Sequence, residues 1–255
     1  MTKTYRIGQI VPSSNTTMET EIPAMLHARE QIRPERFTFH SARMRMKKVT
    51  QEELAQMDAA SDRCALELSD ARVDVLGYAC LVAIMATGKG YHRQSEARLR
   101  EVTRGNGGDA PVVTSAGALE AALHVIKARR IALVAPYMRP LTELVVDYIR
   151  HEDIEVVDWR ALEIPDNLEV GRHDPARLPG IVAGMDFSSV DAIVLSACVQ
   201  MPSLAAVAEV EAMTRKPVVT AAIATAYALL EALKLEPIVP GAGALLSGAY
   251  GTGRR

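Results

Sequence analysis

The chain has 255 residues, enough for one large domain or two closely packed lobes, and its 49% apolar and 24% charged residues are typical of a globular protein. A net charge of −2 without a dense basic run argues against nucleic-acid binding, and the apolar runs are too short to span a membrane. Three cysteines are too few for a disulfide framework, and we see no signal peptide, so we expect a cytoplasmic protein with reduced thiols.

Short apolar runs alternate with helical patterns along the chain. The segment 50–71 has apolar residues at helical spacing, with Cys64 on the apolar side, and 140–152 opens with a proline suited to a first helical turn. Runs rich in Val and Ile are typical of parallel strands buried on both faces, and they occupy 6–11, 73–79, 111–115, 130–135, 154–159, 190–197 and 217–221. The alternation predicts an α/β fold of doubly wound, mainly parallel sheets.

Three pairs of segments recur in the same order, which indicates an internal duplication. The pairs are RIGQIVPSSN (6–15) with RIALVAPYMR (130–139), VDVLGYAC (73–80) with VDAIVLSAC (190–198), and PVVT at 111–114 with PVVT at 217–220. The two copies span roughly 6–124 and 130–235. We therefore predict two pseudo-equivalent lobes with an active-site cleft between them, residues 1–115 plus 221–255 forming the first lobe and 116–220 the second.

Short polar residues follow the first strand in VPSSNTTMETE (11–21). Ser13, Ser14 and Asn15 favour a turn, and Thr16 with Glu19 fits a capping box at the start of a helix. Such a helix start is a natural site for a carboxylate, although a plain cap is also consistent with the motif. In the second copy, Tyr137 follows Pro136 where Ser13 follows Pro12, so we expect the two strand ends to contact different parts of one ligand.

Two of the three cysteines end equivalent strands of the two copies. Cys80 and Cys198 each follow an apolar run, where unpaired backbone N–H groups would favour a thiolate. A lone cysteine there would be interpreted as a small buried hydrophobic residue, but a matched pair predicts a catalytic role for the two thiols. Cys64, inside a helix, is expected to be inert core.

The remaining motifs are weaker. Gly88 and Gly90, in the segment 84–92 after Cys80, would allow a flexible lid, and Asn167 lies in a polar segment (164–174) whose composition favours a surface turn. We find no phosphate loop, dinucleotide fingerprint or metal-ligand spacing, and expect His92 or His173 to be exposed. The sequence therefore predicts a site without metal or cofactor.

The segments VPSSNTTMETE, GYACLVAIMATGKGY and SACVQMPSL resemble the aspartate/glutamate racemase superfamily and, within it, the maleate cis–trans isomerase family, over nearly the whole chain. The resemblance implies cofactor-free conversion of maleate, a small dicarboxylate, to fumarate. One thiolate adds to an alkene carbon, and the adduct rotates about the new single bond before the thiolate leaves. It implies a role in nicotinate degradation and a homodimer or higher homo-oligomer.

Carried over to this chain, the resemblance makes Cys80 the nucleophile, Cys198 its partner, and Asn15, Tyr137 and Asn167 the carboxylate ligands. Ser13, Ser14, Leu81, Val82 and Val199 are further expected substrate contacts. The glycines after Cys80 and the stiffer VQMP after Cys198 favour this order of the two cysteines.

Alternative functions remain open at this stage. The same fold supports a cofactor-independent amino-acid or hydantoin racemase, in which two cysteines act as base and acid, or an arylmalonate-type decarboxylase, which would need only one cysteine. A non-catalytic pair of lobes that binds a dicarboxylate would need no nucleophile.

Overall fold

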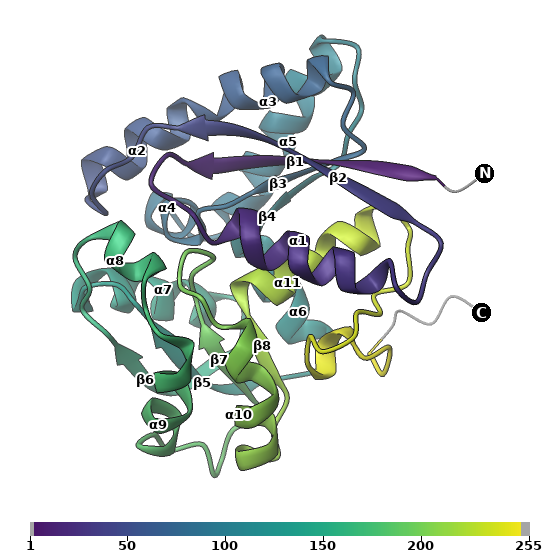
Figure 1. Ribbon diagram of the computed structural model, residues 1–255. Coiled ribbons are helices and arrows are strands. Elements are labelled where there is room, and N and C mark those ends of the chain that lie inside the picture. The colour runs from purple at the N-terminus through teal and green to yellow at the C-terminus, as the bar shows by residue number, and fades with distance from the viewer. Residues whose placement is uncertain (1–2, 251–255) are drawn as a thin grey trace.

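Two four-stranded sheets, each parallel throughout, dominate the computed structural model, which describes residues 3–250 (Figure 1). The strand orders are β2-β1-β3-β4 and β6-β5-β7-β8, so the second sheet repeats the order of the first. The strands are β1 Thr4–Pro12, β2 Arg36–Met44, β3 Val75–Tyr78, β4 Val112–Thr114, β5 Arg130–Ala135, β6 Glu155–Ala161, β7 Ala192–Ser196 and β8 Val218–Thr220. The predicted α/β fold with two pseudo-equivalent lobes is confirmed.

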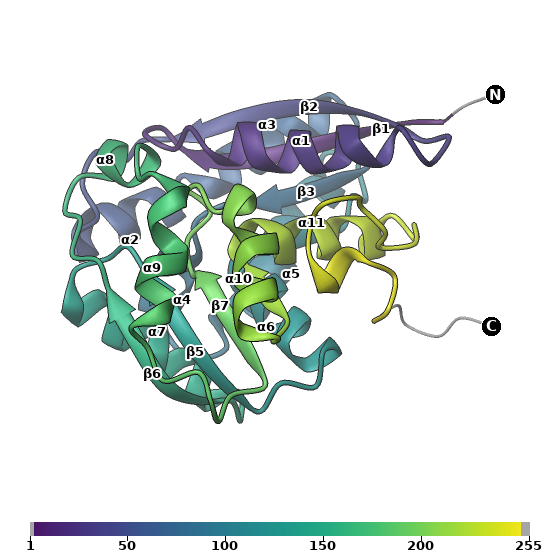
Figure 2. The ribbon, with the colours of Figure 1, turned by 60° about the horizontal axis from the view of Figure 1, so that its bottom comes forward.

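Helices cover both faces of each sheet (Figure 2). In the first sheet, α1 and α11 pack on one side, while α3 and α5 pack against β1, β2 and β4. The helices are α1 Met18–Arg29, α2 Gln51–Ala59, α3 Ser61–Asp70, α4 Leu81–Thr87, α5 Tyr91–Gly105, α6 Ser115–Val125, α7 Arg139–His151, α8 Asn167–Gly171, α9 Leu178–Ala183, α10 Val207–Thr214 and α11 Ala221–Ala232, with short 3-10 helices at Pro175–Arg177, Leu204–Ala206 and Ala244–Leu246.

Helices α6 and α11 pack against each other between the two sheets (Figure 1). Each begins directly after the last strand of its copy, capped by the threonine of the PVVT segment: Thr114 Oγ1 accepts from Gly117 N at 3.0 Å and Thr220 Oγ1 from Ile223 N at 3.1 Å. Both helices contact β4 and β8 and therefore join the two sheets.

Three segments differ in local structure from what the sequence analysis assigned or left unassigned. Strand β2 lies in a segment that we did not assign, although Phe37 and Phe39 in RFTFH alternate with polar residues. The single helix expected over 50–71 is two helices, because the chain turns at Ala60. The segment 84–92, which could be a lid, is mostly helical: α4 and α5 flank a short turn in which Gly90, with φ +70°, provides the left-handed conformation before α5.

Equivalent backbone hydrogen bonds place the two cysteines at equivalent positions in the two sheets. Ala79 N donates to Ile10 O, and Ala197 N donates to Val134 O, both at 2.9 Å. Each cysteine follows that alanine, beyond the carboxyl end of an inner strand. In each sheet this end lies at the point where the strand order reverses, which is where open α/β sheets bind ligands.

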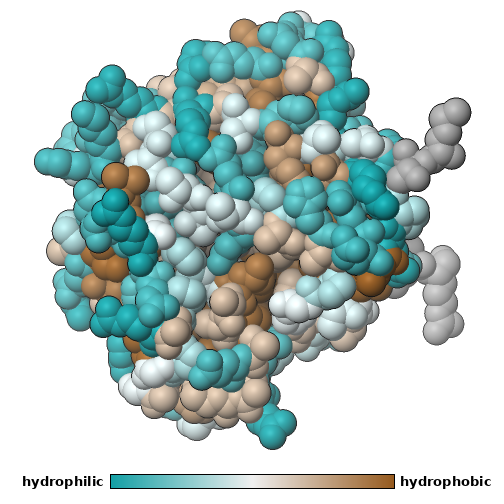
Figure 3. Space-filling view, in the orientation of Figure 1, coloured by the Kyte–Doolittle hydropathy of each residue, from teal (hydrophilic) through white to brown (hydrophobic). Residues whose placement is uncertain are grey.

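The outer surface is mixed in polarity. On the face shown in Figure 3, apolar residues form small patches separated by hydrophilic ones. None of the helices within residues 3–250 combines the length and apolar character needed to cross a membrane.

Candidate active site

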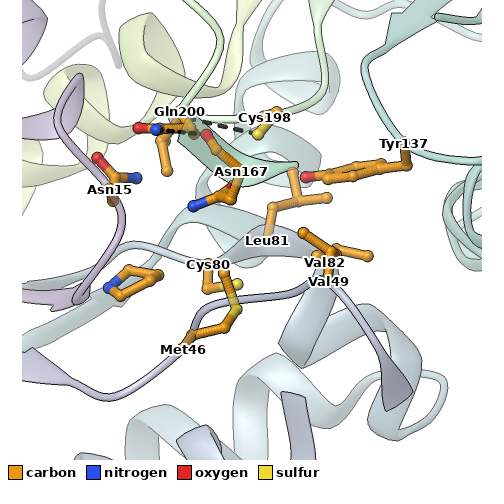
Figure 4. Close-up of a pocket in the computed structure, with 12 residues that line it drawn as sticks. Asn15, Met46, Val49, Cys80, Leu81, Val82, Tyr137, Asn167, Cys198 and Gln200 are labelled. Carbon is orange, nitrogen blue, oxygen red and sulfur yellow. Dashed lines mark hydrogen bonds between the residues drawn. The ribbon is translucent and has the colours of Figure 1, made fainter. Parts of the chain in front are cut away.

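A small cavity lies between the lobes, at the carboxyl ends of strands from both sheets (Figure 4). Cys198 and Gln200 face Cys80 and Met46 across it, with Asn15 toward one end and Tyr137 toward the other. Its lining residues follow β1, β2 and β3 in the first copy and β5, β6 and β7 in the second: Pro12, Asn15, Met46, Val49, Cys80, Leu81, Val82, Tyr137, Asn167, Cys198, Val199 and Gln200.

Eight of the ten predicted site residues line this cavity; Ser13 and Ser14 do not. Ser13 is exposed and bonds the backbone of Met46, accepting from its N–H at 3.0 Å and donating to its carbonyl at 3.2 Å. Ser14 Oγ accepts from Asn167 Nδ2 at 2.8 Å, so Ser14 orients a cavity residue.

Asn15, rather than the predicted Thr16 and Glu19, caps α1. Its Oδ1 accepts from the amides of Thr17 and Met18, both at 3.0 Å, and Glu19 instead pairs with Arg43. Because Oδ1 already accepts two backbone hydrogen bonds, the side-chain amide is held with Nδ2 toward the cavity (Figure 4). Within residues 3–250, Nδ2 has no hydrogen-bond partner. The side chain is thus a pre-oriented hydrogen-bond donor.

The N–H groups of residues 16–18, at the start of α1, already have acceptors within the protein, contrary to expectation. Gln200 Oε1 accepts from Thr16 N at 2.8 Å and from Thr17 N at 3.3 Å, and Asn15 Oδ1 accepts from Thr17 N and from Met18 N. The carboxylate site predicted at the N-terminus of α1 is therefore closed by Gln200, a side chain from the opposite lobe.

The sequence analysis missed four lining residues, Pro12, Met46, Val49 and Gln200, and Gln200 is the one with the most hydrogen bonds. Its Nε2 donates to Ser14 O at 3.1 Å and to Asn167 O at 2.8 Å, and its backbone carbonyl accepts from Thr17 Oγ1 at 2.7 Å. All four hydrogen-bonding positions of the side-chain amide are satisfied. The only available signal was its place two residues after a strand-end cysteine.

The two thiols have different surroundings. Burial raises the pKa of Cys80 to about 12, offset only by the N–H of Ala83. Burial also raises the pKa of Cys198, but three donors oppose it: the Tyr137 hydroxyl and the N–H groups of Gln200 and Met201. Burial thus outweighs the thiolate-favouring effect predicted at the strand ends, and Cys198 is the thiol with more support for negative charge.

Tyr137 is buried beside both cysteines. Its hydroxyl lies 3.0 Å from Ala197 O and next to the Cys198 sulfur. The hydroxyl has one proton, which it donates to Ala197 O or, when Cys198 is a thiolate, to the sulfur. Burial, together with the neighbouring cysteines, raises the pKa of Tyr137 far above its usual value, so the phenol remains protonated and can act as a donor.

The cavity offers hydrogen-bond donors but no charged side chain. Its lining holds no Lys, Arg, His, Asp or Glu, and no group within residues 3–250 accepts from the backbone N–H of Leu81, Val82 or Val199. Together with the amides of Asn15 and Asn167, these N–H groups suit an anion with several acceptor oxygens. Cys64, by contrast, is fully buried in α3, away from this lining, as predicted.

Two similar α/β lobes that each place one cysteine at a shared cleft define a protein of the aspartate/glutamate racemase superfamily. The model of the arylmalonate decarboxylase family matches residues 7–246.

Relatives of known name narrow this assignment. A maleate isomerase of Pseudomonas putida is 79% identical over 98% of this chain and all of its own length. A crystal structure of the Pseudomonas putida S16 maleate isomerase, a cysteine-to-alanine variant with maleate, is 68% identical with a TM-score of 0.96, covering 97% of this chain and 99% of that one. A Nocardia farcinica maleate cis–trans isomerase is 48% identical with a TM-score of 0.92, covering 95% and 98%; it is a cysteine-to-serine variant with a covalently bound succinylcysteine intermediate. The chain belongs to the maleate isomerase family.

Proposed function

We propose that this protein converts maleate to fumarate without a cofactor, through a covalent cysteine adduct. The observation on which this rests is the pair of cysteines facing one small cavity, surrounded by uncharged donors. A racemase or a decarboxylase on this fold is the less favoured reading, because the most similar relatives are named maleate isomerases.

The carboxylates of maleate would bind to neutral donors. Asn15 Nδ2, the remaining N–H of Asn167 and the amides of Leu81 and Val82 face the cavity, and their fixed positions need no reorganisation when charge develops. Because the lining holds no cationic side chain, no single carboxylate is locked in an ion pair. One carboxylate can therefore move as the substrate rotates.

The cysteines divide the chemistry between them. Cys198, whose thiolate has three donors, removes the proton of Cys80 as the Cys80 sulfur forms a bond to one alkene carbon. The displaced electron pair moves toward the carboxylate on the other carbon, and Cys198 returns the proton to that carbon. The product is a succinyl thioether on Cys80 and a regenerated Cys198 thiolate.

Rotation then precedes the reverse reaction. The former double bond is now single, so the two carboxylates can swing from cis to trans within the adduct. Cys198 removes the proton that it delivered, the carbon–sulfur bond breaks, and fumarate leaves with Cys80 reprotonated. In the Nocardia farcinica variant, a succinylcysteine is present although a cysteine has been replaced by serine, which supports this division of roles.

Proton NMR of the purified protein with maleate tests the activity, and fumarate is the expected product. Intact mass spectrometry after acid quench tests the mechanism: Cys198→Ser should accumulate an adduct of one substrate mass, and Cys80→Ala should show neither adduct nor turnover. An adduct that persists in Cys80→Ala and vanishes in Cys198→Ala would reverse the roles, and production of a racemised or decarboxylated compound instead of fumarate would refute the activity.

The cellular setting and assembly belong to the same proposal. We propose a cytoplasmic homodimer that acts in nicotinate degradation, as the family resemblance implies. We also propose that residues 1–115 with 221–255 form one lobe and 116–220 the other; packing of α11 against α1, β3 and β4 supports this division.

A further inference from the structure

A second cluster of titratable side chains lies outside the cysteine cavity. His92 near the start of α5, Glu120 in the middle of α6 and Glu152 at the end of α7 each offer one ligand atom, and these atoms lie within 4.8 Å of one another. None of the three lines the cavity, and in the described part of the chain this is the one group of its kind. His92 is buried, contrary to the exposure expected for it.

Glu120 is the unusual member of this cluster. Its side chain is 3% exposed, and neither carboxylate oxygen has a hydrogen-bond partner within residues 3–250. The helix does not require a glutamate at this position, because the equivalent position of α11, found by aligning the two PVVT segments, is Ala226. A buried carboxylate without partners is costly, so it indicates a missing ligand.

His92 is oriented as a metal ligand would be. Its Nδ1 lies 2.7 Å from the Tyr148 hydroxyl, and its Nε2 faces Glu120 Oε2 at 3.4 Å without hydrogen-bond geometry. Metal-bound histidines usually have their second ring nitrogen bonded in this way. Two tetrahedral zinc ligands with bonds of about 2.0 Å are about 3.3 Å apart, close to the observed separation.

The local charges also favour a cation. Arg93 and Glu96 of α5 are charged neighbours of Glu120, and His151, at the end of α7, is a neighbour of Glu152. Arg93 donates to both oxygens of Glu152, at 2.9 and 2.6 Å, so Glu152 would bind an ion through its remaining lone pairs. Glu96 accepts from Thr114. Burial and the neighbouring Glu152 raise the pKa of Glu120 to about 8.

We propose that His92, Glu120 and Glu152 bind one divalent transition-metal ion of the zinc type. One imidazole and two carboxylates favour such an ion over Mg²⁺ or Ca²⁺. The ion would join α5, α6 and α7, with solvent reaching it past Glu152, whose side chain is 12% exposed. Its role is structural, because the cluster is separate from the cysteine cavity.

Titration of the metal-free protein with Co²⁺ tests the proposal. We expect one equivalent to bind with visible d–d absorption, to be displaced by Zn²⁺, and to raise the midpoint of thermal unfolding. A near-ultraviolet thiolate-to-cobalt band would place the ion on cysteines and overturn the proposal, as would the absence of binding.

Variants assign the site. Glu120→Gln retains the shape of the side chain and should weaken Co²⁺ binding at least about tenfold. Glu143→Gln, at an exposed position of α7, should leave binding unchanged. Equal Co²⁺ affinity in Glu120→Gln and in the wild type would overturn the assignment of Glu120 as a ligand.

Discussion

Replacement of Gln200 by alanine tests whether one side chain holds the two halves of the site together. Gln200 is 2% exposed, and its amide forms four hydrogen bonds. Three cross the lobe interface, to Thr16 N, Thr17 N and Ser14 O at 2.8, 3.3 and 3.1 Å, and the fourth, to Asn167 O at 2.8 Å, lies within the lobe of Gln200. The variant would release all four groups and leave a space that water can enter.

The expected loss follows from these bonds. A typical hydrogen bond contributes about 0.5–1.5 kcal/mol net, and water would satisfy part of what is released, so we expect the free energy of unfolding to fall by about 2–4 kcal/mol. The released turn contains Asn15, and the released α8 contains Asn167. Because displacement of catalytic groups by about 1 Å can cost about 100-fold in rate, we expect kcat/KM for maleate to fall about 10- to 100-fold.

Glu21→Ala is the matched control. Glu21 Oε1 also joins the lobes, accepting from Ser203 N at 2.6 Å and Leu204 N at 2.7 Å, but Glu21 does not line the cavity. Urea unfolding and maleate kinetics of both variants, at a temperature where both are folded, separate stability from positioning. Glu21→Ala should lose stability with only a few-fold change in kcat/KM.

Two results would refute this reasoning. Wild-type kcat/KM in Gln200→Ala would show that Asn15 and Asn167 need no support from Gln200. Equal kinetic losses in Gln200→Ala and Glu21→Ala would assign the effect to the lobe interface as a whole.

Other predictions concern single groups. Asn15→Ala should weaken transition-state stabilisation by about 2–4 kcal/mol, seen as a loss of kcat/KM, and wild-type kinetics would contradict its role as a donor. Tyr137→Phe removes a donor that opposes the raised pKa of Cys198, so the pH profile of kcat/KM should move to higher pH; an unchanged profile would argue against contact with the thiol. Cys64→Ser should lower stability by about 1–3 kcal/mol and change turnover only a few-fold, and a folded but inactive variant would contradict its assignment to the core. The raised pKa of Glu120 means that the folded state holds an extra proton between about pH 4.5 and 8, so without metal the free energy of unfolding should fall by up to about 1.4 kcal/mol per pH unit as pH rises through that range. Glu120→Gln should remove this pH dependence of stability, and an identical slope in the variant would refute its assignment to Glu120.

Local patterns in the sequence were sufficient to predict the fold class and the two-lobe organisation of the molecule. Alternation of apolar runs with helical segments predicted parallel sheets, and repeated segments predicted two lobes, because strand and helix periodicities are properties of neighbouring residues. Since carboxyl ends of parallel strands lie together, residues just after the strands, such as Cys80, Cys198, Asn15 and Tyr137, could be predicted to meet in one cleft.

Only the tertiary structure decided which polar groups remain free. Asn15 and Thr16 are one residue apart, yet Asn15 offers its amide to the cavity while the N–H of Thr16 is taken by Gln200, which lies 184 residues away in the sequence. Local propensity predicts a cap but cannot identify a partner from the other lobe. The same is true of burial: His92 is buried because α6 and α7 meet α5, and burial also raises the pKa of both cleft cysteines above their usual value. Hydrogen-bond pairing and desolvation depend on contacts between distant segments, and those contacts exist only once the chain has folded.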